Sequence, residues 1–521
     1  GQVRINNGDN ISWLYTYDLG KDIGNPYERG DSSGGTTSDI IDRVFNTVNY
    51  KNVSQERIGE AIDEVTKYFK DKTAIELKPE EIKILLADGS KTTQILLISL
   101  QKAKTQELVE KIANSSIEIT QYLGKLIDNK MEHNIIEEIG TISRENIGIA
   151  LEAVNKLEDK SKANKIIDSM LQVSTKIENE LSKITLKPNK LCRETIAIKV
   201  VEKEENKNNI VLPQILIEKA MKQNIDNIKI LSNLGQLEIV PNFVGRDIGE
   251  DVNINITKQT SMLNIEFKLG DKVISQFEKP IKITLPYDKL VTHKNKITTI
   301  LVKKGGMKES TGGVYDENTK TVKFLTNRSG SFTIEEEAKE FKDISKHKWA
   351  EEAVESMAVK GIIDGRTTTK FDPTSNITRA EFAALVSRML KYQEGSSEQI
   401  PFQDVSNNKW YYSSVAAVYE NGLISGKSPT SFDPDGYITR EEVAKIIGKI
   451  LEKNSYKKQD KIELDKFNDG SSIASWAQEG AAIAVYNGII EGSEGKFMPK
   501  QNATRAETAV MLYRLYDLIM D

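Results

Sequence analysis

The sequence predicts a multidomain α+β protein: a helical bundle, then a β-sandwich-like domain, then an all-α region of three repeats. Three observations favour this fold class. Apolar residues recur every three or four positions as far as residue 188, and they alternate with a period of two from 189 to 335. After residue 340 one frame of residues returns three times. A chain of 521 residues is long enough for several such domains.

Residues 1–35 are predicted to hold one or more terminal strands and a linker. The alternating, aromatic run from Ile11 to Gly20 is typical of a half-buried strand, and Gly30–Gly35 is rich in glycine and serine. The run resembles the last strand of a small extracellular β domain related to that of transcobalamin. Because the chain begins with Gly1 and shows no export signal, we interpret it as part of a longer exported protein.

Residues 36–188 are predicted to be helical, as an antiparallel bundle or as helical hairpins. Several apolar stripes have helical spacing, and Ser54 is placed to cap the segment that carries Ile58 and Ile62. The stretch Ile75–Leu86 is ambiguous between short strands and a helix, and we expect it to end at Asp88-Gly89-Ser90. Buried bundle seams are the plain interpretation of the stripes, and a docking groove for a partner helix is the alternative.

Residues 189–335 are predicted to form the β-sandwich-like domain. Strand-like alternation recurs between turn signals, as at 252–256, 263–267 and 281–285. One helix is expected from Pro213 to Met221. The acidic run Glu335–Glu340 is expected to be a short helical or flexible connector.

The three repeats share at least eight positions, and successive arginines of the frame are 61 and 65 residues apart. Each copy has Phe-x-Asp, a Trp, two glycines four residues apart, Phe-x-Pro and a Thr-Arg pair with a Glu two positions later. The glycines are expected to end a first helix. Thr and Glu are expected to form a capping box at the start of a second helix. The capping pairs are Thr378 with Glu381, Thr439 with Glu442, and Thr504 with Glu507.

This frame resembles the S-layer homology domain, in copies at 341–400, 401–462 and 463–521. The resemblance implies that the three units close into a pseudo-threefold bundle. It also implies non-covalent attachment to a secondary cell-wall polysaccharide of a bacterial, Gram-positive envelope, whose acidic sugar carries a ketal-linked pyruvate. Extracellular localisation at the cell wall or S-layer follows from it, without catalysis or a cofactor.

The arginines of the frame are the first candidates for binding an acidic sugar. A guanidinium group binds a carboxylate with two donors, and a helix start favours an anion. The alternative is an arginine that only pairs with the neighbouring acid of its capping box. In the second copy Glu441 replaces the usual alanine, and we expect it to weaken anion binding there. The candidates are Arg379, Arg440 and Arg505.

Three further sets of residues are candidates for polysaccharide binding, each with a structural alternative. The aspartates either accept hydrogen bonds from sugar hydroxyls or cap the Trp-bearing helix. The tryptophans stack on a pyranose or, as the energy of burying about 200 Å² favours, pack in the core. The glycines serve turns first and close ligand approach second. They are Asp343, Asp404, Asp469, Trp349, Trp410, Trp476, Gly365, Gly426 and Gly492.

Composition argues against several other functions. A net charge of −5 gives no basic footprint for nucleic acid, and no apolar run approaches the roughly 20 residues of a membrane span. The three histidines and the single cysteine, Cys192, form no metal-ligand or nucleophile pattern. We therefore expect an anchor that is not an enzyme. The alternatives are the tail of an exported enzyme with an upstream catalytic domain and an S-layer lattice subunit.

Overall fold

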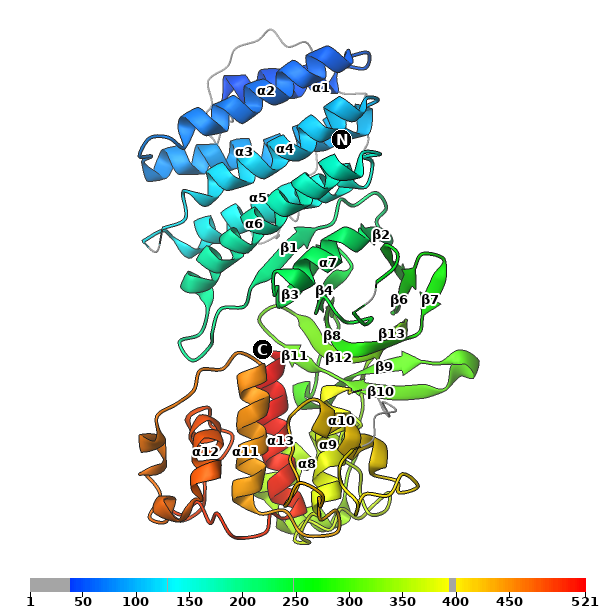
Figure 1. Cartoon of the computed structure of the whole chain (residues 1–521), viewed down its shortest axis with the longest axis vertical. Coiled ribbons are helices and arrows are strands. Elements are labelled where there is room, and N and C mark those ends of the chain that lie inside the picture. The colour runs from blue at the N-terminus through cyan, green and yellow to red at the C-terminus, as the bar shows by residue number, and fades with distance from the viewer. Residues whose placement is uncertain (1–37, 129, 247, 393–399) are drawn as a thin grey trace, which may run out of the picture.

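The structure is a computed structural model that describes residues 38–128, 130–246, 248–392 and 400–521. The predicted terminal strand at 11–20 and the linker at 30–35 lie outside these residues. Along the long axis of the molecule, stacked helices come first, two sheets follow, and the repeats form the other end (Figure 1).

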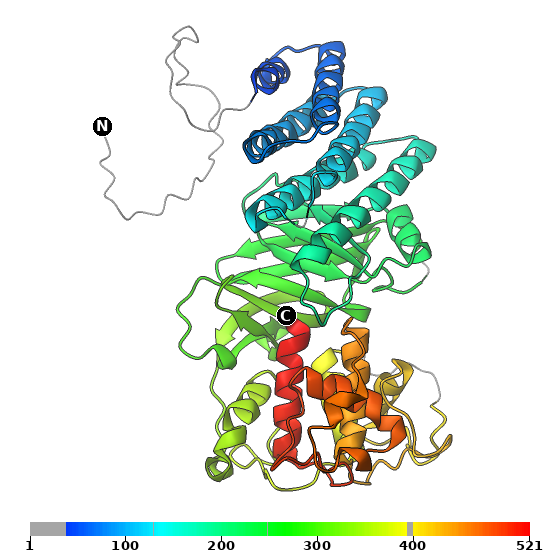
Figure 2. The ribbon, with the colours of Figure 1, turned by 90° about the vertical axis from the view of Figure 1, so that its left-hand side faces the viewer.

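The helical region is a stack of three helix pairs, as the alternative of helical hairpins predicts, and not a single bundle (Figure 2). α1, α3 and α5 pack in one row and α2, α4 and α6 in the other, and α5 and α6 rest on β1 of the next domain. Each helix buries the apolar stripe that its sequence carries. The bounds are α1 (Asp39–Asn49), α2 (Gln55–Lys72), α3 (Pro79–Lys102), α4 (Gln106–Gly124), α5 (His133–Val154) and α6 (Lys160–Thr185).

Successive helix pairs are joined by the same glutamine contact. The Gln55 side chain donates to the carbonyl of Lys102 (3.0 Å) and accepts from the amide of Lys104 (2.7 Å). Gln106 repeats this contact with Lys156 (3.2 Å) and Glu158 (2.9 Å). The helical region is therefore itself repetitive, which our sequence analysis missed. The signal was Ser-Gln-Glu at 54–56 and Thr-Gln-Glu at 105–107.

The expected end of a segment at Asp88-Gly89-Ser90 is wrong, because α3 continues through these residues. The Asp88 carboxylate is buried and accepts hydrogen bonds from the Ser38 amide and the Tyr68 hydroxyl. A Cβ at Gly89 would lie 3.1 Å from Ile142 of α5. Here aspartate and glycine serve packing between helices, which overrides their local preference for turns.

The next region holds two sheets that pack face to face, with α7 (Gln214–Lys222) beside them where the sequence predicts a helix. One sheet has the order β1-β3-β4-β8-β12-β11 and the other β10-β9-β13-β6-β5-β2, with β7 paired to β6. The inner faces meet in aromatic contacts such as Phe267–Phe277, with ring centroids 4.8 Å apart. The strands are β1 (Thr195–Lys199), β2 (Lys207–Leu212), β3 (Asn227–Ser232), β4 (Gly235–Ile239), β5 (Val252–Gln259), β6 (Met262–Leu269), β7 (Lys272–Ile274), β8 (Gln276–Pro286), β9 (Ile297–Val302), β10 (Lys308–Gly312), β11 (Val314–Asp316), β12 (Thr321–Arg328) and β13 (Gly330–Glu336).

The connector expected at Glu335–Glu340 is wrong for its first two residues, which belong to β13 and pair with β9. Both acids have partners that stabilise them in a strand. Glu335 pairs with Lys308 (2.8 Å), and Glu336 accepts the amide of His293 (2.8 Å).

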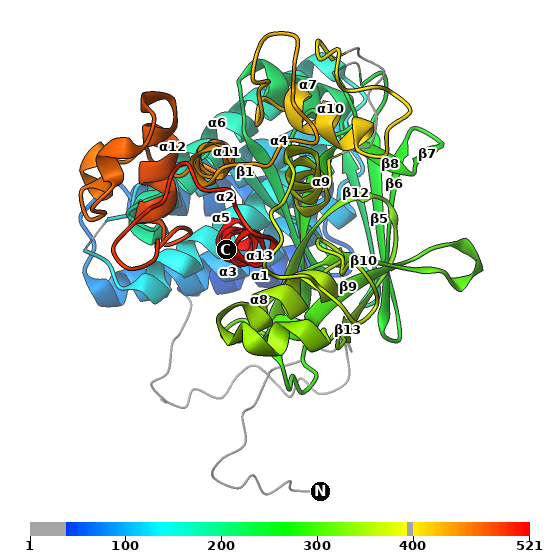
Figure 3. The same cartoon turned by 90° about the horizontal axis from the view of Figure 1, so that it is seen from below.

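Each repeat is a helix–loop–helix unit, and the units contact one another in a ring. The second helix of each unit packs on the first helix of the next: α9 on α10, α11 on α12, and α13 on α8. Figure 3 shows α9, α11 and α13 close together, with the other three helices outside them. The bounds are α8 (Lys348–Val359), α9 (Arg379–Leu390), α10 (Tyr412–Glu420), α11 (Arg440–Lys453), α12 (Ser475–Tyr486) and α13 (Arg505–Met520).

Three backbone hydrogen bonds close the same ring ahead of the second helices. Ile377 donates to the carbonyl of Ala503 (3.0 Å), Ala503 donates to Ile438 (2.9 Å), and Ile438 donates to Ile377 (3.1 Å). Each unit therefore satisfies one backbone group of a neighbour, and no unit completes this pattern alone.

The local chemistry of the repeats follows the sequence. All three predicted capping boxes are present. The first helices end at Gly361, Gly422 and Gly488, whose φ angles are 67°, 68° and 71°. After Gly361, the amide of Ile362 donates to Met357 (3.0 Å), which is the Schellman arrangement that a glycine at this position permits.

The ends of the three first helices dock on the preceding domains. Lys360, the residue before Gly361, is buried, and its ammonium donates to the carbonyl of Asn295 (2.8 Å). At the equivalent positions, Asn421 accepts from Lys279 (3.0 Å) and Asn487 accepts from Asn189 (2.6 Å). One end of the repeat region is thereby covered.

Candidate functional site

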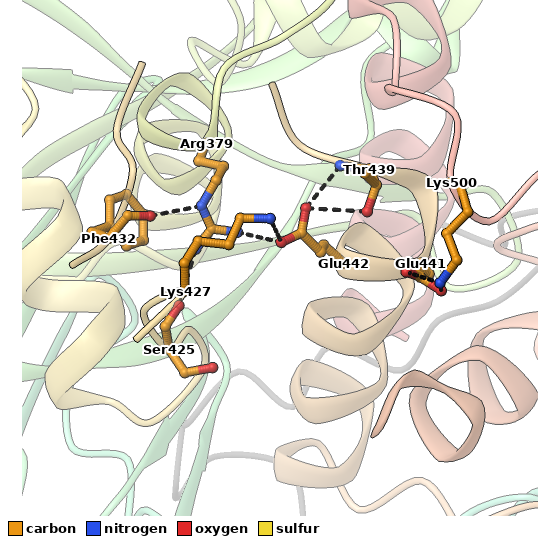
Figure 4. A network of polar contacts seen from close by, with 8 residues as sticks. All are labelled: Arg379, Ser425, Lys427, Phe432, Thr439, Glu441, Glu442 and Lys500. Atoms are coloured by element: carbon orange, nitrogen blue, oxygen red, sulfur yellow. Dashed lines mark hydrogen bonds and ion pairs between the residues drawn. The ribbon is translucent and has the colours of Figure 1, made fainter. Parts of the chain in front are cut away.

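The recurring frame places an arginine at the first position of each second helix, and each arginine reaches into the next repeat. Arg379 of α9 donates to the carbonyls of Phe432 (2.8 Å) and Ser425 (3.0 Å) and to the carboxylate of Glu442 (2.7 Å). Its guanidinium carbon lies 4.7 Å from the centroid of the Phe432 ring. Figure 4 shows this network between α9 and α11.

The other two arginines follow the same rule around the ring. Arg440 donates to the carbonyl of Phe497 (2.8 Å) and to Glu507 (2.9 Å). Arg505 donates to the carbonyl of Phe371 (3.0 Å). For Arg379 and Arg440 the partner is the capping glutamate of the next repeat. The alternative of pairing within one capping box is therefore wrong for them, and these residues join repeats.

All three arginines are 6% exposed, so most of each guanidinium group contacts protein atoms rather than solvent. Burial lowers the pKa of Arg379 and Arg505, yet a guanidinium remains charged at any physiological pH. Glu442 balances this charge. Burial raises the pKa of Glu442, but hydrogen bonds from Lys427 and the Thr439 amide, together with Arg379, outweigh it and hold the pKa below its usual value.

A pocket of about 310 Å³ opens beside Arg379. Its wall includes Arg379, Lys427, Glu442, Lys445 and Trp476, together with apolar side chains. The Lys445 ammonium lies 5.0 Å from the centroid of the Trp476 ring. The pocket therefore combines cationic groups with an exposed aromatic face, and it draws on all three repeats.

The equivalent positions differ between repeats, so the spaces between repeats differ in charge. The residue after the second glycine of each frame is Arg366, Lys427 or Ser493, and Arg366 pairs with Glu381 (2.8 Å). Five residues after the frame arginine stand Ala384, Lys445 and Val510. The pocket beside Arg379 has a lysine at both positions.

The tryptophans are on the surface, so the expectation that they pack in the core is wrong. Trp349, Trp410 and Trp476 are 60%, 63% and 49% exposed. The residue after the Trp is buried instead, as Ala350 and Ala477 show. In the second repeat the buried residue after the Trp is Tyr411, and in all three repeats the Trp ring stays outside and available for contact with a ligand.

The three aspartates do not cap the Trp-bearing helix, so that alternative is wrong. The Asp343 carboxylate accepts hydrogen bonds from the amides of Phe371 (2.8 Å) and Asp372 (2.7 Å). Asp404 and Asp469 accept the matching amides of Phe432 and Phe497 at 2.8 and 2.6 Å. Each aspartate therefore holds the Phe-x-Pro segment whose carbonyl an arginine of another repeat binds.

The second glycines of the frame are required by packing inside the repeat. A Cβ at Gly365 would lie 2.4 Å from the Phe341 ring, and one at Gly426 or Gly492 would lie 2.6 Å from Phe402 or Phe467. This contact explains why Phe and Gly recur together in the frame.

The carboxylate of Glu441 binds groups other than Arg440. It is buried, binds the ammonium of Lys500 (2.7 Å) and accepts the amide of Ala474 (3.0 Å). Our expectation that it weakens anion binding beside Arg440 did not include this compensating lysine.

Acid is expected to loosen the repeats through Asp343 and its equivalents. Burial raises the pKa of each carboxyl, but the accepted backbone N–H groups outweigh it and lower the pKa. A lowered folded-state pKa gives stability that is present above the unfolded value of about 3.9 and is lost as the pH falls through the folded-state pKa.

Asp343→Asn is expected to cost about 1–2 kcal/mol at pH 7 and to reduce the loss of stability between pH 5 and pH 2. Urea unfolding followed by tryptophan fluorescence measures both, since three of the four tryptophans lie in the repeats. Asp288→Asn, at an exposed loop residue, is the control. Equal pH profiles for wild type and Asp343→Asn would refute this role.

Comparison with known proteins identifies the repeats. The family model described as "S-layer homology domain" matches residues 340–383, 401–444 and 466–509. Three S-layer homology domains are present. Curated relatives include an amylopullulanase of Thermoanaerobacterium thermosulfurigenes, 30% identical over 53% of this chain, and the surface-layer 125 kDa protein of Lysinibacillus sphaericus, 36% identical over 32%. S-layer protein EA1 of Bacillus anthracis is 30% identical over 33% of the chain.

These matches place the protein at the cell surface, associated with the cell wall outside the cell. The chain spans only 15%, 14% and 19% of the length of the three relatives. The match to the amylopullulanase covers 285 residues, so it extends beyond the S-layer homology domains. Among the described helices, none is long and apolar enough to cross a membrane.

Proposed function

We propose that the S-layer homology domains form a pseudo-threefold, all-α unit that binds secondary cell-wall polysaccharide and so anchors an exported protein without a covalent bond. The single observation that carries this proposal is the pocket beside Arg379, where two lysines and an exposed tryptophan face one space. The stacked helix pairs and the two sheets act as a stalk that carries whatever the anchor holds.

The pocket has the chemistry that an acidic sugar needs. A ketal-linked pyruvate presents a carboxylate, which the ammonium groups of Lys427 and Lys445 bind, and a pyranose face stacks on Trp476. Arg379 contributes from the pocket wall, but its donors already bond to Ser425, Phe432 and Glu442. Its larger contribution is to hold the wall in place, so that the lysines and the ring do not reorganise on binding.

The ring of repeats explains how weak sites give firm attachment. The Arg440 and Arg505 sites have the same framework with other side chains at the entrance, and they offer the polymer further contacts. Linking such sites on one rigid unit raises the overall affinity by about 10²–10⁴ when one polymer reaches more than one of them.

Trp476→Ala is expected to weaken binding of soluble wall-polysaccharide fragments about tenfold, because a stacking contact contributes about 1.5 kcal/mol. Calorimetric titration of the intact chain with short fragments measures this without avidity. Tyr486→Ala is the control, because Tyr486 lies on the same helix with similar exposure (46%) and does not line the pocket. Unchanged affinity for Trp476→Ala, or equal losses for both variants, would overturn the assignment of this pocket.

Two alternatives have support among the relatives. An amylopullulanase and an endoglucanase share sequence with this chain, which favours a passenger enzyme whose active site lies in another part of the polypeptide. S-layer proteins also share sequence with this chain, which favours a lattice subunit. We propose that the described residues are not themselves catalytic. Ordered two-dimensional assembly on isolated wall sacculi would favour the lattice, and hydrolysis of a wall or storage glycan by this chain alone would contradict the proposal that its described residues are not catalytic.

A further inference from the structure

A second cavity, of about 490 Å³, lies where the linker after α6, the first sheet and the S-layer homology domains meet. We call it the junction cavity. Its charged lining includes Lys190 and Arg193 of the linker, together with Lys229, Glu238 and Lys282 of the sheet. It is separate from the pocket beside Arg379, with which it shares no lining residue.

The floor of the junction cavity is a row of charges across three strands. Lys229 of β3 is paired with Glu238 of β4, and Glu238 is paired with Lys282 of β8. Their chain neighbours Ile228, Leu237 and Ile283 are buried in the core between the sheets. Since side chains alternate along a strand, the charged row lies on the opposite face, toward the repeats.

The roof of the junction cavity is formed by the linker and the second repeat, which are bonded to each other. Arg193 donates to the Ser455 hydroxyl (2.8 Å) and to the carbonyl of Lys453 (3.1 Å). The Lys190 ammonium lies 5.0 Å from the centroid of the Tyr456 ring, and the Leu191 amide donates to the carbonyl of Ser455 (2.6 Å). The cavity therefore has fixed walls from three parts of the chain.

Positive charge in the junction cavity exceeds the negative charge that faces it. Among the described residues, Lys190, Lys229 and Lys282 form no ion pair within 4.0 Å, and Glu238 is the one acid in their row. The other lining acids are engaged: Asp521 pairs with Lys187, Glu178 with Arg144, and Asp226 accepts the Glu194 amide. Burial lowers the pKa of Lys190 to about 8 and also lowers that of Lys282, and the carboxylates that oppose this effect, Asp521 for Lys190 and Glu238 for Lys282, do not outweigh it.

We propose that the junction cavity binds a compact oxyanion, either free phosphate or the carboxylate of a sugar acid. Such an anion would bind the ammonium groups of Lys190, Lys229 and Lys282 and so join the sheet to the linker, which is itself bonded to the second repeat. This site is additional to wall anchoring, and it would make the attachment of the anchor to its stalk depend on an anion.

The test is calorimetric titration of the intact chain, free of wall polymer, with inorganic phosphate and separately with glucuronate, at low ionic strength. One anion is expected to bind per chain at a site that Lys282→Gln weakens at least tenfold. Binding of phosphate alone identifies free phosphate as the ligand, and binding of glucuronate alone identifies a sugar acid. Lys272→Gln, at an exposed lysine of β7, and Lys445→Gln, in the pocket beside Arg379, are expected to leave this site unchanged.

Glu238→Gln is expected to increase anion affinity, and a misfolded protein would not show such an increase. It removes the one carboxylate of the charged row, so anion affinity is expected to rise about tenfold while the fold is kept. Absence of binding by the wild-type chain would overturn the proposal. So would Lys282→Gln affinity equal to that of wild type in a folded protein, or Glu238→Gln affinity that does not rise.

Discussion

Arg379→Met is expected to destabilise the S-layer homology domains by about 3–5 kcal/mol, because it leaves the buried carboxylate of Glu442 without its buried cationic partner. Glu442 would keep only the exposed Lys427 as a cationic partner, and the carbonyls of Phe432 and Ser425 would lose their donors. Methionine preserves most of the volume, so the loss reports on polar contacts rather than on a cavity.

Urea unfolding followed by tryptophan fluorescence measures this change. Arg388→Met is the matched control, since Arg388 lies on the same helix and pairs with Asp364 (3.1 Å), but both partners are exposed. An exposed ion pair is worth about 0–1 kcal/mol, so the control is expected to be nearly neutral. Equal losses for both variants would contradict the view that the frame arginines hold the repeats together.

Gly480→Ala is expected to destabilise the repeats by about 2–3 kcal/mol, although alanine is the better helix former by about 1 kcal/mol. A Cβ at Gly480 would lie 2.7 Å from the Cα of Lys445, and one at Gly448 would lie 2.3 Å from the Cα of Gly480. α11 and α12 therefore cross with their backbones in contact. The crossing also sets Lys445 against Trp476, so polysaccharide binding should fall together with stability.

Gly59→Ala is the control for Gly480→Ala, because it changes the helix propensity without creating a close contact between helices. Gly59 lies inside α2, and the nearest atom to its Cβ would be the flexible end of Lys111, at 3.7 Å. This variant is expected to stabilise the helical region by up to about 1 kcal/mol, measured by circular dichroism during urea unfolding. A neutral or stabilising Gly480→Ala would contradict the close crossing of α11 and α12.

The parts of the fold that were predictable depend on neighbours in sequence. The capping pair Thr378–Glu381 and the helix end at Gly361 are decided within a few residues, and both are present. The period of the apolar pattern likewise separates the helical region from the sheets. At Asp88 and Gly89 the same local reasoning failed, because a contact with another helix decides the conformation there.

The roles of the site residues were not predictable, because their partners are distant in sequence. Arg379 binds Glu442 of the next repeat, and Asp343 binds the amide of Phe371. The sequence marks these positions as recurring, but recurrence does not say whether a side chain meets a ligand or another repeat. Trp476 shows the same limit, since the energy of burial favoured the core while the helix crossing buries Ala477 instead.

The most direct test of wall anchoring compares the affinity of the intact chain for purified secondary cell-wall polysaccharide before and after its ketal-linked pyruvate is removed. We expect tight binding to the native polymer and a loss of at least a hundredfold without pyruvate, since each occupied site would lose the carboxylate that its cations bind. Equal binding to both polymers would contradict recognition of an acidic sugar by these S-layer homology domains.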